Sequence, residues 1–357
     1  MKVLLTGSAG FIGSAIGAAL EAEGYDVVRV DLMLATAHGD ARPPAGTHHL
    51  DVRDAAHDRA WSGVLDGVGL VCHQAAVVGA GTSVADLPLY AGHNDLGTAA
   101  LFAAMTEHGI RRLVLASSMV VYGEGRYRCA AHGDRTPPIR SVEALQSGDF
   151  AVYCDLCGES LSWGLVDETA RLDPRSSYAA SKVAQEHYAA AWARQADATA
   201  IALRYHNVYG PGMPADTPYS GVAAIFRSSL ERGEPPQVFE DGGQVRDFVH
   251  VDDVARANLA ALQATAEAEG GRLATYNVAS GVPVTIGRVA ELVAAGAGRA
   301  VQPAVTGRFR LGDVRHVVAS PARAEHDLGF RARIGPEVGL PAFATAPLRP
   351  AAGHQVV

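Results

Sequence analysis

The chain has 357 residues, of which 48% are hydrophobic, so it can bury a sizeable core in one large domain or two closely packed ones. Acidic residues outnumber basic ones by 38 to 30, and the net charge of −8 argues against nucleic acid or an anionic membrane as the main partner. No apolar run reaches the length of a membrane span and no secretory signal pattern opens the chain, so we expect a soluble cytoplasmic protein.

The first 210 residues alternate short apolar strands with alanine-rich helices. Strands are expected at 2–7, 26–32, 69–76, 111–118 and 198–208, and helices at 11–24 and 95–109. Continuous apolar strands separated by helices predict a parallel sheet that is covered on both faces. With right-handed crossovers, this is an α/β fold with a Rossmann-type doubly wound parallel sheet.

The character of the sequence changes near Gly210, where glycine, proline and aromatic residues become frequent and the alternation becomes irregular. We therefore expect a first domain over 1–209, which also uses part of 245–270, and a smaller C-terminal α/β domain over 210–345. The end of the chain, 346–357, has no periodicity and is expected to be loose.

The stretch "TGSAGFIG" forms a glycine-rich turn between the first strand and the first helix. Such a turn lets backbone N–H groups and the helix N-terminus approach the pyrophosphate of a dinucleotide. The alternative is a plain strand–helix turn, which the position of the motif disfavours. The candidate cofactor residues in it are Gly7, Gly10, Phe11, Ile12 and Gly13.

Asp31 ends the second strand, 18 residues beyond Gly13. A carboxylate at this place accepts hydrogen bonds from the ribose 2′-OH and repels a 2′-phosphate, which favours NAD over NADP. The alternative is a solvated acid at a strand end. Asp51 and the backbone N–H of Val52 follow the next strand, where they are expected to meet the adenine.

The stretch "SSYAASKVAQEHY" puts Tyr178 and Lys182 four residues apart, on one helix face. An unperturbed tyrosine, with a pKa of about 10, is a poor base at neutral pH. A neighbouring ammonium and the positive nicotinamide ring favour the phenolate, and they make a tyrosine able to take a proton from an alcohol. Alone, this spacing is common on ordinary helices; it becomes informative after the glycine turn and "ASSMVVYG".

Together these residues resemble the extended short-chain dehydrogenase/reductase family, and within it the NAD-dependent sugar-nucleotide epimerases and dehydratases. The matching stretches, which run from Lys2 to about Phe330, are "TGSAGFIG", "HQAA", "HNDLGT", "LASSMVVYG", "YAASK", "LRYHNVYGPG", "VRDFVHVDDVA", "YNVASG" and "RLGDVRH". The resemblance implies a tightly held NAD and a nucleoside-diphosphate sugar as substrate.

The resemblance also implies roles for single residues. Ser118 matches the hydroxyl that hydrogen-bonds the reacting sugar oxygen, whereas Ser117 is expected to be structural. Tyr178 matches the catalytic base, and Lys182 matches its partner, which also binds the nicotinamide ribose. Asn94 matches a structural asparagine near the cofactor.

Three further residues match positions that hold the substrate diphosphate. Guanidinium forks suit phosphate oxygens, which supports the two arginines among them. An ordinary salt bridge to Asp247 or Asp252 is the alternative for one of them, Arg246, and two other arginines near Arg310 leave that choice open. The set is Asn207, Arg246 and Arg310.

The residues after Ser118 separate the activities within the family. Dehydratases of the family have a pair of acidic residues directly after this serine. This chain has Met119 and Val120 there, which can neither donate nor accept the proton that elimination requires. A decarboxylase is disfavoured because its usual acid is missing from this loop. We therefore expect an epimerase that inverts C4 of a UDP- or dTDP-hexose through a transient 4-keto sugar. The alternatives are an NDP-4-ketosugar reductase or another NDP-sugar oxidoreductase or dehydratase, and, in a different class, a non-catalytic NAD-sensing module.

Tyr178 follows Tyr122 by 56 positions, where family members usually have a short loop. The extra segment, 126–165, contains "CAAHG" and "CDLCG", each a ligand type, two residues, a second ligand type and a glycine, as in zinc turns. We expect a zinc-ribbon-like insertion with a closed Cys₃His site, which would hold structural zinc and carry no chemistry. The alternatives are unrelated thiols or a redox pair. The ligands would be Cys129, His132, Cys154 and Cys157.

The insertion is similar to those of some sugar-nucleotide 4-epimerases, including dTDP-L-rhamnose 4-epimerases. The family resemblance further implies a homodimer that forms through a four-helix bundle. The helix after Asn94 and the helix that carries Tyr178 would build this bundle.

Overall fold

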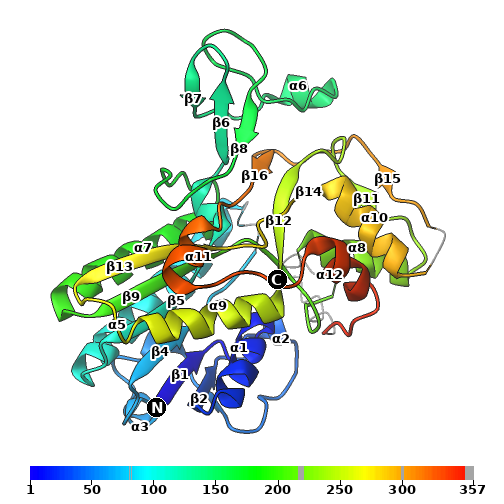
Figure 1. Cartoon of the computed structure of the whole chain (residues 1–357). Helices are drawn as coiled ribbons and strands as arrows, with labels where there is room; N and C mark the ends of the chain where they lie inside the picture. The colour runs from blue at the N-terminus through cyan, green and yellow to red at the C-terminus, as the bar shows by residue number, and fades with distance from the viewer. Residues whose placement is uncertain (80, 82, 216–220, 299–300, 350–357) are drawn as a thin grey trace.

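A computed structural model describes residues 1–79, 81, 83–215, 221–298 and 301–349. Its largest element is a seven-stranded, fully parallel sheet with the order β13-β9-β5-β4-β1-β2-β3 (Figure 1). The prediction of a Rossmann-type sheet is confirmed. The strands are β1 (Lys2–Thr6), β2 (Asp26–Asp31), β3 (Thr47–His49), β4 (Leu70–His73), β5 (Arg112–Ser118), β9 (Thr199–Tyr205) and β13 (Arg272–Val278).

The edge strand β13 shows that this sheet extends beyond the range expected from the sequence. It lies outside both 1–209 and 245–270, yet it pairs with β9 along its whole length, from Arg272 opposite Thr199 to Val278 opposite Tyr205. The sequence around β13 follows a long helix in a region of irregular alternation, so its pattern alone did not assign it to the first sheet.

Helices cover both faces of the sheet, as the continuous apolar strands predicted. Alternate strand residues point to opposite faces, so Leu4 packs in one core with Trp61, and Leu5 packs in the other with Ile16. On the first face lie η1 (Val52–Asp54), α3 (Arg59–Leu65), α5 (Gly97–Glu107) and α7 (Ser177–Ala196); on the second lie α1 (Phe11–Ala22), α9 (Val251–Ala264) and α11 (Ala322–Leu328).

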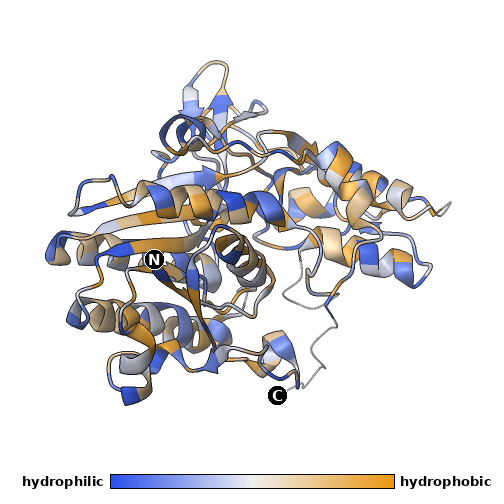
Figure 2. Ribbon diagram, turned by 60° about the horizontal axis from the view of Figure 1, so that its bottom comes forward, coloured by the Kyte–Doolittle hydropathy of each residue, from blue (hydrophilic) through white to orange (hydrophobic). Residues whose placement is uncertain are grey.

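Helices α1 and α9 lie side by side, and the central strands show mostly hydrophobic colours (Figures 1 and 2). Among the residues that the structure describes, no helix is long and apolar enough to cross a membrane. Short elements connect the larger ones: α2 (Ala35–His38), η2 (Val84–Asp86), α4 (Leu87–Tyr90), η3 (Ala91–Leu96) and η4 (Met119–Tyr122).

A smaller unit follows, with a core that includes Phe226, Phe248, Val289 and Phe343. Its strands are β10 (Asn207–Tyr209), β11 (Gln237–Val238), β12 (Val245–His250), β14 (Pro283–Thr285), β15 (Ala304–Val305) and β16 (His316–Val317). Its helices are α8 (Val222–Glu231), α10 (Ile286–Gly296) and α12 (Pro336–Phe343). Strand β12 is central, since it pairs with β10, β14 and β16.

The expected insertion forms a separate three-stranded antiparallel sheet at the top of Figure 1. It contains β6 (Arg126–Cys129), β7 (Gly133–Arg135), β8 (Ser162–Gly164) and the short helix α6 (Val142–Gln146). A small core of Tyr127, Cys129, Val152, Cys154 and Leu161 fills it.

The beginning of the expected loose tail is ordered. Gly212 donates its N–H to Pro347 O at 2.7 Å, and Arg349 N donates to Met213 O at 3.1 Å. The prediction was therefore wrong for 346–349, because backbone hydrogen bonds to a distant loop leave no periodic pattern in the sequence. The rest of that expectation, 350–357, lies outside the described residues.

Candidate functional site

The structure brings Ser118, Tyr178 and Lys182 together at the carboxyl end of β5. Tyr178 and Lys182 lie on the first two turns of α7, whose N-terminus is capped by the Ser176 hydroxyl. Ser118 hydrogen-bonds the Tyr178 side chain, and the Lys182 Nζ lies 5.9 Å from the centre of the tyrosine ring. Lys182 is also fixed, because its Nζ donates to Ala116 O at 2.9 Å.

Burial sets the electrostatics of this trio. It raises the pKa of Tyr178, although the hydrogen bond with Ser118 partly opposes that shift. Burial also lowers the pKa of Lys182 to about 8, against the opposing charge of Glu186. Near pH 7 the lysine is therefore still mainly a cation and the tyrosine a neutral phenol, so proton removal by Tyr178 requires additional positive charge nearby.

A buried polar network supports the trio from below. Ser117 Oγ donates to Glu186 Oε1 at 2.5 Å, which agrees with a structural role for this serine. Two hydrogen bonds of 2.9 and 2.7 Å join Arg204 to Glu186, and Arg204 Nη1 donates to the Tyr122 hydroxyl at 2.9 Å. Sequence reasoning missed this network, although Glu186 lies one turn after Lys182 and a helical i, i+4 search would have found it.

The glycine turn has the shape that a dinucleotide site needs. Gly7 has φ +65°, and a Cβ there would lie 2.7 Å from Ala75 N; a Cβ on Gly13 would lie 2.0 Å from Gly7 O. Gly10 is the N-cap of α1, so Phe11 and Ile12 present first-turn N–H groups that have no partner within the helix. These groups can hold a pyrophosphate.

Asp31 lies beside this turn at the end of β2. It accepts hydrogen bonds from Ala9 N at 2.9 Å and from Met33 N at 2.8 Å, and His38 lies 3.4 Å away. Burial alone would raise the pKa of Asp31, but hydrogen bonds from His38, Met33 and Ala9 hold it below its ordinary value. The carboxylate is therefore ionised and placed to meet a ribose.

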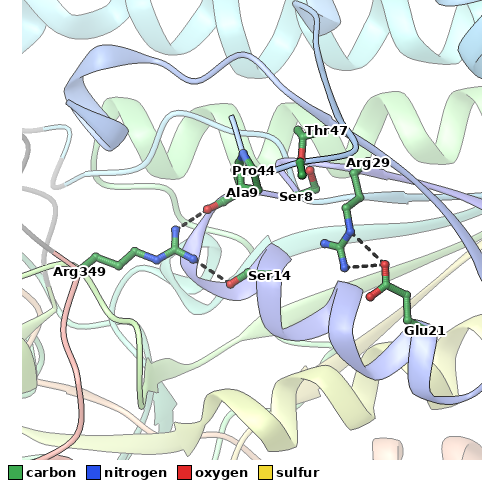
Figure 3. Close-up of a pocket in the computed structure, with 9 residues that line it drawn as sticks. Ser8, Ala9, Ser14, Glu21, Arg29, Pro44, Thr47 and Arg349 are labelled. Atoms are coloured by element: carbon green, nitrogen blue, oxygen red, sulfur yellow. Dashed lines mark hydrogen bonds and ion pairs between the residues drawn. The ribbon is translucent and has the colours of Figure 1, made fainter. Parts of the chain in front are cut away.

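Arg349 lies against the glycine turn, which the sequence did not suggest. Its guanidinium donates to the carbonyls of Ala9 and Gly10 and, at 2.8 Å, to Ser14 Oγ (Figure 3). It lines a cavity of about 400 Å³ beside the turn, together with Ser8, Ser14, Arg29 and Thr47.

Asp51, Val52 and Asn94 have structural contacts. Asp51 caps η1 by accepting from Arg53 N at 2.9 Å and forms an ion pair with the same arginine at 2.5 Å, and Val52 is buried behind it. Asn94 exchanges hydrogen bonds with both backbone groups of Val77 and donates to Ser181 Oγ at 2.9 Å. It thereby fixes the loop after β4 to α7.

The expected substrate residues lie in the smaller unit. Asn207 begins β10, and its Oδ1 is buried without a hydrogen-bond partner among the described residues. Arg246 lies on β12 and is 3.7 Å from Asp313, so neither Asp247 nor Asp252 is the acid recorded beside it. Arg310 is exposed, with its guanidinium 5.1 Å from the centre of the Phe239 ring.

The four expected metal ligands converge, and their ligand atoms all lie within 4.8 Å of one another. Cys129 Sγ is 3.5 Å from His132 Nδ1 and 3.7 Å from Cys157 Sγ, and Cys154 Sγ is 3.6 Å from the same histidine nitrogen. A tetrahedron with the usual Zn–S and Zn–N bond lengths has edges of roughly 3.8 and 3.6 Å, so the donor set fits zinc. All four cysteines of the chain are free thiols.

Buried histidines predict how the fold responds to acid. Burial lowers the pKa of His73 and of His206 from 6.5 to about 3, so both are neutral in the folded protein at pH 7. The unfolded chain binds these protons below pH 6.5, and stability should therefore fall as the pH drops from 6.5 toward 3, by up to about 1.4 kcal/mol per pH unit for each histidine. Urea unfolding at pH 7, 6 and 5 measures this slope. A His206→Phe variant should show a shallower slope, and an identical slope would contradict this account.

Comparison with known proteins agrees with the geometry. The model of the NAD dependent epimerase/dehydratase family matches residues 3–144 and 158–279. The chain is 34% identical to dTDP-L-rhamnose 4-epimerase of Burkholderia thailandensis, over 95% of this chain and 93% of that protein. It is 29% identical to UDP-glucose 4-epimerase of Mycolicibacterium smegmatis, over 95% of this chain and 96% of that protein.

Solved structures show the same fold. UDP-glucose 4-epimerase of Thermus thermophilus in complex with NAD superposes with a TM-score of 0.75 and 32% identity, covering 96% of this chain and 98% of that one. MoeE5 in complex with UDP-glucose and NAD superposes with a TM-score of 0.73 and 31% identity, covering 96% of this chain and 97% of that one.

Proposed function

Because this chain belongs to the NAD-dependent epimerase/dehydratase family, we propose that it is an NAD-dependent enzyme that inverts C4 of a nucleoside-diphosphate sugar. The observation that carries the proposal is the joint placement of Ser118, Tyr178 and Lys182 at the carboxyl edge of a Rossmann-type sheet. The larger unit would bind NAD, and the smaller unit would bind the sugar nucleotide. Relatives named as sugar-nucleotide 4-epimerases, and neighbours in complex with NAD, support both assignments.

The residues suggest how the reaction proceeds. When bound, NAD would supply the acceptor for a hydride from C4 and, once reduced, the donor that returns it to the opposite face of the sugar ring. Tyr178 takes the proton of the C4 hydroxyl and later gives it back, while Ser118 holds the same oxygen by a hydrogen bond. Lys182 supplies positive charge that favours the phenolate form of Tyr178. The 4-keto sugar turns over between the two hydride transfers.

The surroundings of Ser118 favour epimerisation over dehydration. Met119 and Val120 begin η4 directly after Ser118, and Val120 N donates to Ser118 Oγ at 3.4 Å. Neither side chain can exchange a proton, whereas the elimination of water requires a group that can. The side chains of Ser118, Tyr178 and Lys182 are the ones that an epimerase needs.

The test is product analysis by NMR after incubation with a panel of UDP- and dTDP-hexoses, without added coenzyme. The proposal expects a C4 epimer to form. A product that forms only when reduced coenzyme is added would favour an NDP-4-ketosugar reductase instead. Binding of NAD without turnover of any sugar nucleotide would favour a non-catalytic NAD-sensing module.

Cofactor choice gives a separate prediction. The purified protein should release NAD(H) on denaturation, because the Asp31 carboxylate repels a 2′-phosphate. Asp31→Ala should weaken NAD binding and reduce the preference over NADP, as measured by competition titration. Asp26→Ala, at the exposed start of the same strand, is the matched control and should change neither. Release of mainly NADP(H) from the unmodified protein would contradict the prediction.

We also propose that the insertion holds a structural zinc ion on Cys129, His132, Cys154 and Cys157. The distances between the donor atoms support this proposal. So do Gly133 and Gly158, which follow the two ligand pairs with φ +69° and +73°, the left-handed conformation expected for zinc turns. All four tetrahedral positions would be protein ligands, so the metal would have no open position for substrate.

A homodimer is the expected assembly, and exposed apolar side chains support it. Leu87 and Leu96, in α4 and η3, are 45% and 57% exposed, and Tyr188 on α7 is 44% exposed. The helix after Asn94, which continues through α5, and helix α7 would form the bundle with their copies in a second chain. Light scattering at micromolar concentration should report a dimer, and Leu96→Glu should shift it toward monomer. A monomeric unmodified protein would contradict the proposal.

A further inference from the structure

The insertion docks on a short stretch of the smaller unit, residues 313–316. In Figure 1, the strand β16 that begins in this stretch lies at the foot of the insertion sheet. The Tyr127 hydroxyl accepts from His316 N at 3.0 Å and donates to Glu124 Oε2 at 2.8 Å. Gly125 N donates to His316 O at 3.0 Å. Both Glu124 oxygens accept from Arg315 N at 3.1 Å.

A second connection is made by Arg140, a residue of the insertion whose side chain contacts the smaller unit. Its guanidinium donates two parallel hydrogen bonds of 2.9 Å to the Glu240 carboxylate and a third, also 2.9 Å, to Asp313 O. Arg315 Nη1 donates to the same carboxylate at 2.7 Å. The Arg140 and Glu240 side chains are only 6% and 1% exposed, so the pair is shielded from water and salt.

Arg246 of the smaller unit also hydrogen-bonds the 313–316 stretch. Arg246 Nη2 donates to Val314 O at 2.6 Å, and Nη1 donates to Arg315 O at 2.9 Å. The insertion and Arg246 therefore both hydrogen-bond the backbone of this four-residue stretch. Arg310, the other arginine expected to bind the diphosphate, also lies close to Glu240. Its guanidinium stacks on the ring of Phe239, the residue before Glu240.

We propose that the insertion helps to position the substrate diphosphate. Arg140 is the residue that links the insertion to the diphosphate-binding side chain Arg246. By fixing Glu240 and the 313–316 stretch, Arg140 holds the carbonyls that aim the Arg246 guanidinium. The proposal rests on the proposed function, because it takes Arg246 as a ligand of the diphosphate. It adds that an insertion without catalytic groups sets affinity for the diphosphate part of the substrate.

The geometry favours this role over simple attachment. An insertion that needed only a fixed base would be secured by Tyr127 and Glu124, which lie at the root of its sheet. Arg140 instead pairs across 100 residues with a carboxylate that already has a partner in Arg315. Two guanidinium groups on one buried carboxylate make its position depend on both, so the loss of one should shift the other.

The test measures binding of nucleotides to the full-length protein with NAD and metal in place. We expect Arg140→Ala to weaken binding of UDP and dTDP by about tenfold, within the usual range for coupling between sites. Binding of UMP and dTMP, which lack the second phosphate, should change much less. Arg140→Lys should restore part of the difference, because an ammonium can still pair with one oxygen of Glu240. NAD and zinc content are measured on the same samples and should be unchanged.

Arg128→Ala is the matched control. Arg128 belongs to the same insertion, but its side chain is exposed and its ion pair with Asp134 is long, at 3.9 Å. It should bind all four nucleotides as the unmodified protein does. If Arg140→Ala fails to fold, Tyr127→Phe removes the hydroxyl contacts and should show the same selective loss. Equal losses for mono- and diphosphates, or none, would overturn the inference alone. An unmodified protein without affinity for either diphosphate would overturn the proposed function with it.

Discussion

Replacing Tyr178 with phenylalanine should lower turnover by at least the factor of about 10²–10⁴ that general acid–base catalysis supplies. The substitution keeps the ring, which packs 5.9 Å from the ring of Tyr90, and removes only the hydroxyl that bonds Ser118. Because the glycine turn and the arginines proposed to bind the diphosphate lie on other elements, binding of NAD and of the sugar nucleotide should persist. Turnover is measured by NMR with the substrate identified from the panel.

Tyr188→Phe provides the control for this experiment. Tyr188 lies on the same helix, about 15 Å along its axis from Tyr178 and away from the trio, so the loss of its hydroxyl should leave turnover unchanged. If Tyr178→Phe kept near-normal turnover with substrate bound, another group would have to remove the proton. The assignment of Tyr178 as the base would then be wrong, although the fold and the family would stand.

The parts of the site that sequence reasoning placed correctly are local in the chain. Tyr178 and Lys182 share one helix face because they are four residues apart, and Gly7 and Gly13 face each other because a strand turns directly into a helix between them. In such cases the spacing itself fixes the geometry. The two zinc-type turns also belong to this class, since each pair of ligands is separated by two residues.

The parts that sequence reasoning missed depend on contacts between distant segments. Arg140 meets Glu240 across 100 residues, and Arg349 meets the glycine turn across more than 330. Neither periodicity nor spacing in the sequence predicts such pairs, because charged residues are frequent and each arginine has many possible acidic partners. The edge strand β13 was missed for the same reason, since its partner β9 is about 70 residues earlier.

Loss of the zinc ion proposed for the insertion should have the second large effect. The purified protein should hold about one zinc per chain, the stoichiometry of a four-ligand structural site. Cys157→Ser removes one thiolate and should abolish tight binding, because structural zinc sites in small domains contribute about 10–16 kcal/mol of apparent binding free energy. The insertion has only a small core of five buried residues, so it should then loosen.

The loosening should be visible as faster proteolysis near 141–148, around α6. NAD should stay bound, because the glycine turn packs on cores that share no residue with the insertion. Cys72→Ala is the control: Cys72 is buried in β4, away from the ligand cluster, and its removal should leave the zinc content unchanged.

Elemental analysis decides the outcome. Less than about a tenth of an equivalent of zinc, in protein purified without chelator, would be inconsistent with structural-zinc affinity. A Cys154–Cys157 disulfide would instead indicate either lost metal or a redox role, since a thiol pair oxidised in this way cannot ligate the metal.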